Sequence, residues 1–268
     1  MNITKYFSYT LILTCLTLII SCSKDENVTN PTAQEVTITD GAQSGSPEGD
    51  TNNNGADEDD LVENASFKQT VLVNFSGTSA TITNPVAGKG VEITQDGANI
   101  TIKSTISEVA YEISGKTTDG SLKLYSDKKF KLSLANADIT NSKGPAINVQ
   151  SSKTAFVILE GENSLSDASS YSNIPINEDA KGTFFSEGQL VFSGTGKLNV
   201  AGKYKHGIVS DDYIRIRGGE INITEAATDG IHTNDYVIVD GGNLNISAKS
   251  DGIDCEEGYI IINGGTFN

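Results

Sequence analysis

The sequence has few basic residues, few cysteines and no tryptophan. Its 19 Lys and Arg stand against 35 Asp and Glu, which leaves a formal net charge of −16. Such a chain lacks the excess of cationic side chains that nucleic acid phosphates require, so a nucleic acid partner is not expected. Two of the three cysteines fall within the first 22 residues, where one is expected to be removed with a signal peptide and Cys22 to carry a lipid. No partner then remains for Cys255, and no disulfide framework is predicted.

Helical patterns and common catalytic motifs are missing as well. After residue 65 no long stretch has apolar residues at helical spacing, whereas Gly is abundant (27) and Val, Ile and Thr supply strand propensity. The sequence therefore predicts an all-β protein. It contains no nucleophile elbow, phosphate loop or zinc-protease motif. Hydrolysis by paired carboxylates stays open, because acidic residues are plentiful.

The first 21 residues form a targeting segment rather than part of the fold. Lys5 precedes an apolar run over residues 9–20, which Ser21 and Cys22 follow. The run is shorter than the ~20 residues of a comfortable membrane span. The segment resembles a bacterial lipoprotein signal peptide, residues 1–21, with Cys22 as the lipidated first residue of the mature chain. An ordinary secretory signal or a membrane anchor is the alternative.

Residues 22–64 predict an acidic, disordered linker. Residues 23–64 carry 11 acidic side chains and one Lys, with few bulky apolar groups to bury. The run SKDEN directly after Cys22 resembles the surface-export signal of lipoproteins in the Bacteroides-type phylum. We therefore expect a protein that is lipid-anchored to the outer membrane and faces the exterior, with the linker as a flexible tether.

Residues 65–268 are built on a repeat of 22–24 residues. One apolar position recurs in steps of 24, 23 and 22, and one glycine position recurs every 23 residues: Phe184, Ile208, Ile231 and Ile253; Gly196, Gly219, Gly242 and Gly265. A repeat of this length, made of strands without a helix, indicates a solenoid whose coils stack to bury their apolar faces. Each repeat has room for about three short strands, which predicts a parallel β-helix.

The alternation within each repeat assigns side chains to the two sides of the coil. The expected inner columns are Ile214, Ile216, Ile221 and Ile223, then Val237, Val239, Leu244 and Ile246, then Ile260, Ile262 and Phe267. Asn199, Asn222, Asn245 and Asn268 should form an outer ladder, and the paired glycines should mark bends. The direction of a column of Tyr213, Tyr236 and Tyr259 stays open. Because the sequence stops inside a repeat, we expect the solenoid to be incomplete at its C-terminal end.

Acidic residues recur at one edge of the stacked coils. Coils ~4.8 Å apart bring equivalent carboxylates close together, and a divalent cation would relieve their repulsion. Calcium suits this oxygen-rich set. We therefore expect Asp229 and Asp251 to share one ion, with Asp235 or Asp254 completing its shell. A solvated acidic edge is the alternative. Zinc is disfavoured, because His206, His232 and Cys255 show no recognisable zinc spacing.

Several segments resemble a known family. These are GKYKHGIVSDD, TDGIHTND and SDGIDCEEG, with ITNSKGPAINVQSSKTAFVILEGENSLSD upstream. They look like the calcium-dependent carbohydrate-binding β-helix proteins of bacteria. The resemblance implies a right-handed parallel β-helix similar to the family-nine pectate lyases. It also implies calcium at coil edges and binding of polygalacturonate-like polysaccharide and cellulose. It assigns the metal role to Asp229, Asp235, Asp251 and Asp254, with Asp211, Asp212 and Glu256 as further candidates.

A calcium ion with an open position could accept the carboxylate of an acidic sugar, which would let an acidic protein bind an acidic polymer. Beside this edge lie candidate ligand-binding residues: Lys181, Lys203, Lys205, His206 and His232. Without Trp, only the Tyr column could grip a neutral polymer such as cellulose. Two other functions stay open. One is a calcium-dependent polysaccharide lyase with Lys205 as its base, and the other is an adhesin or structural spike without a sugar ligand.

Overall fold

The computed structural model describes residues 36–37, 55–172 and 174–268. The chain divides into two compact units, Met1–Gln34 and Glu35–Asn268, and the first lies outside the described residues, as does Cys22. The second unit confirms the all-β prediction. Apart from two short 3-10 turns, η1 (Glu58–Asp60) and η2 (Val62–Asn64), the regular elements among its described residues are strands. None of the helices in the described ranges is long and apolar enough to span a membrane.

The first strands include two antiparallel hairpins. β2 pairs with β3, and β4 pairs with β5. The next pairings, of β2 with β6 and of β5 with β7, are parallel. The strands of this region are β2 (Gln69–Ser76), β3 (Ser79–Thr83), β4 (Val91–Asp96), β5 (Asn99–Ser104), β6 (Val109–Thr117), β7 (Ser121–Ser126) and β8 (Phe130–Thr140). The hairpins bring β3 and β4 to the N-terminal end of the stack, so that they cover its first coils.

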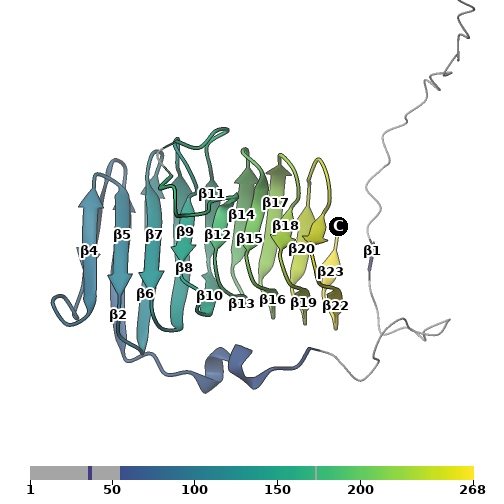
Figure 1. Ribbon diagram of the computed structural model, residues 1–268, viewed down its shortest axis with the longest axis horizontal. Coiled ribbons are helices and arrows are strands. Elements are labelled where there is room, and N and C mark those ends of the chain that lie inside the picture. Colours follow the sequence, from purple (N-terminus) through teal and green to yellow (C-terminus); the bar gives the residue numbers. More distant parts are fainter. Residues whose placement is uncertain (1–35, 38–54, 173) are drawn as a thin grey trace, which may run out of the picture. The chain divides into compact units, whose positions relative to one another are not determined.

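One face of the solenoid is an eight-stranded sheet in the order β21-β18-β15-β12-β9-β7-β5-β4 (Figure 1). Each later coil gives this sheet one strand, and consecutive coils pair in parallel. The later strands of the sheet are β9 (Ile147–Gln150), β12 (Gly182–Ser186), β15 (His206–Ser210), β18 (Ile231–Thr233) and β21 (Ile253–Cys255).

The remaining strands belong to a sheet that bends. β8 pairs with β10 through Phe130–Ala135 and with β11 through Asp138–Thr140, so later coils continue as two separate rows. One row holds β10 (Ala155–Glu160), β13 (Leu190–Gly194), β16 (Ile214–Ile216), β19 (Val237–Val239) and β22 (Ile260–Ile262). The other holds β11 (Glu162–Ser166), β14 (Lys197–Gly202), β17 (Glu220–Ala226), β20 (Asn243–Ile246) and β23 (Thr266–Phe267), with which β1 (Val36–Thr37) pairs antiparallel. Three strand rows per coil define a parallel β-helix, as predicted.

The predicted inner columns are confirmed. Phe184 lies between Ile147 and Ile208, and the column continues through Ile231 to Ile253. The isoleucines, valines and leucine predicted for the inside of β16, β17, β19 and β20 are buried, except Ile246, which is half-buried. Ile260 and Ile262 keep the register but are 44% and 40% exposed, because no described strand pairs with the far side of β22.

The corner between the two rows requires a left-handed backbone. Gly219, Gly242 and Gly265 have φ values of +95°, +92° and +105°. In the coil before them the positive φ, +102°, belongs to Gly194 and not to the predicted Gly196, and Asn136 in β8 has +59°. A side chain on Gly242 would place its Cβ 2.6 Å from the carbonyl oxygen of Gly219 in the coil below. The glycine repeat therefore marks a tight bend, as expected, because both the φ value and the coil spacing exclude a side chain there.

The predicted asparagine ladder is present. Asn222 donates from Nδ2 to Asn199 Oδ1 at 3.1 Å, and Asn245 donates to Asn222 Oδ1 at 2.7 Å. Each amide thus bonds the equivalent amide one coil away. The tyrosine column also forms. The rings of Tyr213 and Tyr236 stack 4.7 Å apart, and those of Tyr236 and Tyr259 stack 5.3 Å apart.

The last residues of the predicted linker lie against the solenoid. Asp60, in η1, is only 2% exposed and pairs with Arg215 of β16, with 3.2 Å between Oδ2 and Nη1. Tyr213 donates its hydroxyl to the same carboxylate. These contacts attach residues 55–64 to the side of the coils. The ordered unit therefore begins before residue 65, where the sequence composition placed its start.

Candidate functional site

The outward side of the eight-stranded sheet carries a column of chemically different residues. By strand register the column runs Lys123, Asn148, Phe185, Val209, His232 and Asp254. Phe185 and Val209 are buried although they lie outside the core cluster, so they separate the polar start of the column from its ionisable end. Asn148 and His232 are three strands apart, which is roughly 14 Å.

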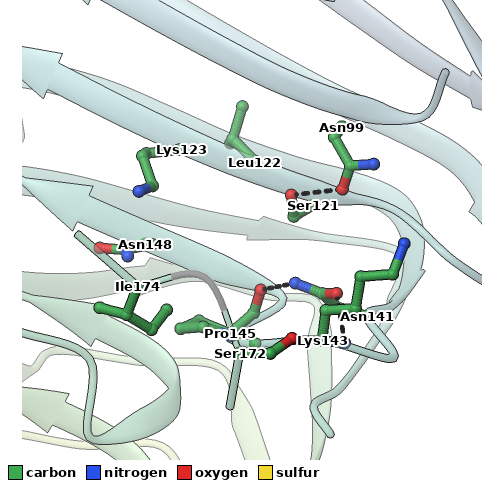
Figure 2. Close-up of a pocket in the computed structure, with 11 residues that line it drawn as sticks. Asn99, Ser121, Leu122, Lys123, Asn141, Lys143, Pro145, Asn148, Ser172 and Ile174 are labelled. Atoms are coloured by element: carbon green, nitrogen blue, oxygen red, sulfur yellow. Dashed lines mark hydrogen bonds between the residues drawn. The ribbon is translucent and has the colours of Figure 1, made fainter. Parts of the chain in front are cut away.

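A pocket lies at the polar start of this column (Figure 2). Residues 167–172 and 174–180, which interrupt the coil period, cross the outside of the sheet here. Ser172 donates its N–H to the carbonyl of Lys143, and Glu178 pairs with Lys123. The pocket has a volume of about 180 Å³, which is less than the ~300–1,000 Å³ of typical pockets for drug-sized ligands. It therefore suits a short part of a polymer.

Asn148 is the buried polar group of this pocket. It is 3% exposed, and its Oδ1 accepts a hydrogen bond from Gln150 Nε2 at 2.7 Å. Among the residues that the structure describes, its Nδ2 has no hydrogen-bond partner. The orientation of the Asn148 amide follows from its neighbours. Gln150 Nε2 also donates to the carbonyl of Asp179 at 2.9 Å, so Gln150 turns its nitrogen, a donor, toward Asn148, and Asn148 must present its oxygen. An unpaired buried donor costs about 1–3 kcal/mol, and such groups often mark binding sites.

Two lysines also line the pocket. Lys123 lies beside Asn148 on the neighbouring strand and pairs with Glu178. The Lys143 side chain is 62% exposed, and its Nζ is 4.0 Å from Asp119 Oδ2. Both ammonium groups and the amide nitrogen of Asn148 are donors, whereas Ser121 and Asn99 bond each other at 2.9 Å. The pocket therefore offers donors and positive charge in a protein that is otherwise acidic.

The ionisable end of the column contains a compact cluster of His206, Asp229 and His232. Their ligand atoms lie within 4.8 Å of one another, and the three residues are 8%, 7% and 5% exposed. His206 Nδ1 is 2.9 Å and His232 Nδ1 is 3.8 Å from Asp229 Oδ2. The two imidazole rings stack with centroids 4.3 Å apart. The coil period places His206 at the start of β15, Asp229 just before β18 and His232 within β18.

Neighbouring groups shift the pKa values of His206 and Asp229 and place two more carboxylates at His232. Burial and the imidazole of His232 lower the pKa of His206 to about 4, although Asp229 opposes the change. Burial raises the pKa of Asp229, but hydrogen bonds from the N–H of Asp251 and the hydroxyl of Ser250 outweigh burial and hold it below its ordinary value. Asp254 Oδ2 is 2.9 Å from His232 Nδ1, and Glu256 Oε1 is 3.5 Å from His232 Nε2.

The other predicted metal ligands lie in separate surroundings. Asp211 pairs with Lys181 at 3.3 Å, and Asp212 accepts hydrogen bonds from Gln189 and from the N–H of Tyr213. Asp235 is exposed beside Asp212, and the Asp251 side chain is exposed and accepts from Ser250 at 3.2 Å. The structure thus brings Asp229 and Asp254 together through His232. It does not gather the seven carboxylates into one group.

The predicted ligand-binding lysines do not reach the pocket. Lys203 is exposed, and its backbone N–H donates to Asp167 at 2.6 Å. Lys205 is exposed too, with Nζ 5.6 Å from the ring centre of Tyr204. Lysines that act as bases are usually buried, and Lys205 is not. Lys181 pairs with Asp179 and Asp211.

The tyrosine column offers little flat surface. Its rings are nearly parallel, at 10° and 5°, and stack on one another along the coils. Both faces of the Tyr236 ring are therefore used within the stack, and Tyr259, which is 50% exposed, is its last ring. A platform for a neutral polymer needs free ring faces, so this column gives little support to the predicted binding of cellulose.

Sequence reasoning missed Lys123, Lys143 and Asn148. The available signal was the insertion at residues 167–180, where the coil period lengthens, because long insertions in solenoids often form binding loops. The period identifies where the extra residues leave the coil. It does not identify which strands they cross, and those strands supply the pocket residues.

Comparisons with known proteins agree with this fold. Residues 87–268 match the family described as carbohydrate-binding domain-containing protein, and the chain belongs to that family. A solved structure, the polysaccharide lyase-like protein from C. thermocellum in a gadolinium derivative, is similar to this chain with a TM-score of 0.64 and 25% identity. The similarity covers 73% of this chain and 80% of that one. No curated protein matches the chain.

Proposed function

We propose that this protein binds an acidic polysaccharide and that the pocket at Asn148 holds one of its carboxylates. Membership of the carbohydrate-binding family supports a sugar ligand. The observation that carries the finer proposal is the unpaired Nδ2 of buried Asn148, which lines one pocket with Lys123 and Lys143. A uronate carboxylate accepts hydrogen bonds from amide and ammonium donors alike.

The pocket geometry suits a ligand that brings its own negative charge. Lys143 is mostly exposed and can turn toward a bound sugar, whereas Lys123 is held beside Asn148 by Glu178. Sugar hydroxyls can bond Asn99, Ser121 and Asn141, which line the same pocket. A neutral sugar would satisfy Asn148 but would gain nothing from the two cations. Charge therefore sets the expected preference for acidic over neutral polymers.

Calcium stays a prediction. The similar protein from C. thermocellum is described as a gadolinium derivative, and gadolinium, like calcium, is a hard cation. In this chain, however, Asp211 and Asp212 are engaged by Lys181 and Gln189, and Asp229 faces two imidazoles. A calcium ion needs six to eight oxygen ligands. Of the pair predicted to share an ion, Asp229 accepts the N–H of Asp251, and the Asp251 carboxylate accepts from Ser250. We therefore place the proposed sugar contact at the pocket and not on a calcium ion.

We propose binding rather than catalysis. A polysaccharide lyase needs a base beside the proton that it removes. Lys205 is exposed against Tyr204, and Lys123 is paired with Glu178. We also retain the proposal that the protein is a lipoprotein attached through Cys22 to the outer membrane and facing the exterior. This part rests on the sequence of residues 1–27.

Isothermal titration with trigalacturonate, compared with a neutral trisaccharide of galactose, tests the proposed function. We expect binding of the acidic sugar that Lys143→Ala weakens, while Lys153→Ala, a change of an exposed lysine outside the pocket, leaves it intact. Equal binding by both lysine variants would contradict the assigned pocket. The absence of binding to any tested glycan would favour the adhesin alternative.

Two further measurements distinguish binding at the pocket from calcium-dependent binding and from lyase activity. Titration in EGTA measures the contribution of calcium, and loss of binding there would place the sugar contact on a metal instead of on the pocket. Ultraviolet absorbance of the mixture follows the unsaturated products of a lyase. Steady growth of absorbance that is lost in Lys205→Ala would overturn the proposal of a non-catalytic protein.

A further inference from the structure

We propose that His206, Asp229 and His232 form a binding site for a zinc-class transition-metal ion, not for calcium. The three residues are each more than nine-tenths buried, and their donor atoms lie within 4.8 Å of one another. They come from two successive coils. His206 begins β15, and the other two stand at β18, so one ion would join these coils.

The donor atoms have a spacing that fits a small ion. Zinc binds imidazole nitrogen and carboxylate oxygen at about 2.0–2.2 Å, so two tetrahedral ligands lie about 3.4 Å apart. The distances from Asp229 Oδ2 to His206 Nδ1 and to His232 Nδ1 are 2.9 Å and 3.8 Å. These values bracket the required separation. Small side-chain movements would therefore bring all three donors onto one ion.

The type of donor decides between the two metals. Two of the three groups are imidazoles, which suit zinc, copper and nickel, whereas calcium takes oxygen ligands. No short spacing between ligands marks a zinc site in the sequence. In a solenoid the relevant spacing is one coil. His206 and Asp229 are 23 residues apart and in contact, so the coil period replaces the local motif.

Neighbouring residues would orient these ligands. The N–H of Asp251 donates to Asp229 Oδ1 at 3.0 Å, which leaves Oδ2 facing the histidines. Glu256 Oε1 lies 3.5 Å from His232 Nε2, and metal-bound histidines commonly have a carboxylate at their second nitrogen. Asp254 Oδ2, 2.9 Å from His232 Nδ1, is the candidate fourth ligand. Thr228 Oγ1 is 3.0 Å from His206 Nδ1 and would have to give up this bond.

Cobalt(II) and zinc test this site on the purified protein. We expect cobalt to bind at one ion per chain and to give visible absorption bands, which zinc removes and excess calcium does not. His232→Ala and Asp254→Asn should each weaken zinc binding at least tenfold in isothermal titration, and Glu256→Gln should weaken it by about tenfold or more. Zinc should also raise the melting temperature of the unaltered protein.

The controls keep the proposal falsifiable. Asp235→Asn changes an exposed carboxylate three residues after His232, outside the cluster, and should leave zinc binding unchanged. Asp254 is 38% exposed at its side chain, so its variant is expected to fold even where His232→Ala does not, as circular dichroism would show. Absence of saturable zinc or cobalt binding, displacement of cobalt by calcium, or unchanged binding in Asp254→Asn and a folded His232→Ala would overturn the assignment.

Discussion

Asp60 and Arg215 form a buried ion pair between residues 155 positions apart in the sequence, with 3.2 Å between Oδ2 and Nη1. Arg215 also bonds the carbonyl of Gly55 and the carboxylate of Asp240. One guanidinium therefore joins the segment before β2, the strand β16 and the turn that follows β19 in the next coil. The contact shows that an acidic, strand-poor sequence can be an ordered part of the unit.

Replacement of Asp60 by Ala is expected to lower the free energy of unfolding. Arg215 and Tyr213 would lose their shared acceptor, and breaking a buried pair costs about 3–5 kcal/mol. We expect about 3 kcal/mol, because Arg215 keeps Asp240. Urea unfolding measures the change. Asp59→Ala is the matched control, since the Asp59 side chain is 91% exposed, and an equal loss in both variants would contradict the assigned role.

Replacement of Asn148 by Leu is expected to separate stability from binding. The variant removes an unpaired buried donor, whose cost is about 1–3 kcal/mol, and Gln150 keeps its bond to Asp179. The melting temperature should stay the same or rise, while the affinity for trigalacturonate should fall at least tenfold. Differential scanning fluorimetry and titration calorimetry measure the two effects. Retained affinity would show that Asn148 does not contact the sugar.

Replacement of Glu187 by Gln is expected to stabilise the protein at neutral pH. Burial, together with the charges of Asp211, Glu178 and Asp179, raises the pKa of Glu187. A carboxyl whose folded pKa is raised binds its proton more tightly in the folded state. Its contribution to stability is therefore present at low pH and is lost as the pH rises from 4.5 through the folded pKa. The melting temperatures of the variant and the unaltered protein should differ at neutral pH and converge at acid pH. A difference that stays constant with pH would refute the explanation.

Replacement of Gly242 by Ala is expected to destabilise the corner of the coil. The residue has a φ of +92°, and an added Cβ would lie 2.6 Å from the carbonyl oxygen of Gly219. We expect a cost of about 1–3 kcal/mol from backbone strain, with the contact adding to it. Gly241→Ala is the control, because its Cβ would lie 3.4 Å from the nearest atom, the carbonyl oxygen of Arg217. Urea unfolding of both variants tests the assignment.

The sequence predicted the parts of this structure that repeat. Stacked coils place equivalent residues over one another, so a count of the spacing was enough to assign the inner column from Ile147 to Ile253 and the ladder from Asn199 to Asn245. The same count places Asp229 and Asp251 on successive coils, where the N–H of Asp251 donates to Asp229 Oδ1. The groups that these side chains contact could not be predicted in this way, because the bend before each strand determines which way each side chain turns.

The parts that could not be predicted are the segments that do not belong to the repeat. Ser172 and Ile174 of the insertion line the pocket, and Glu178 pairs with Lys123. No spacing rule relates these three residues to Lys123 or Asn148. The attachment of η1 by Asp60 is similar. Its acidic composition indicated disorder, but Arg215 and Tyr213 bind Asp60, and Arg217 pairs with Glu63.

The insertion after β11 has a consequence for how such a protein can change over time. Phe184 still lies directly on Ile147, although more residues separate them than separate any later pair of the column. The extra residues therefore leave the strand pairing between the coils on either side of the insertion unchanged. A solenoid of this kind can acquire, lengthen or exchange a binding loop at a coil junction while every strand pairing stays as it was. New ligand preferences can arise there without a new fold.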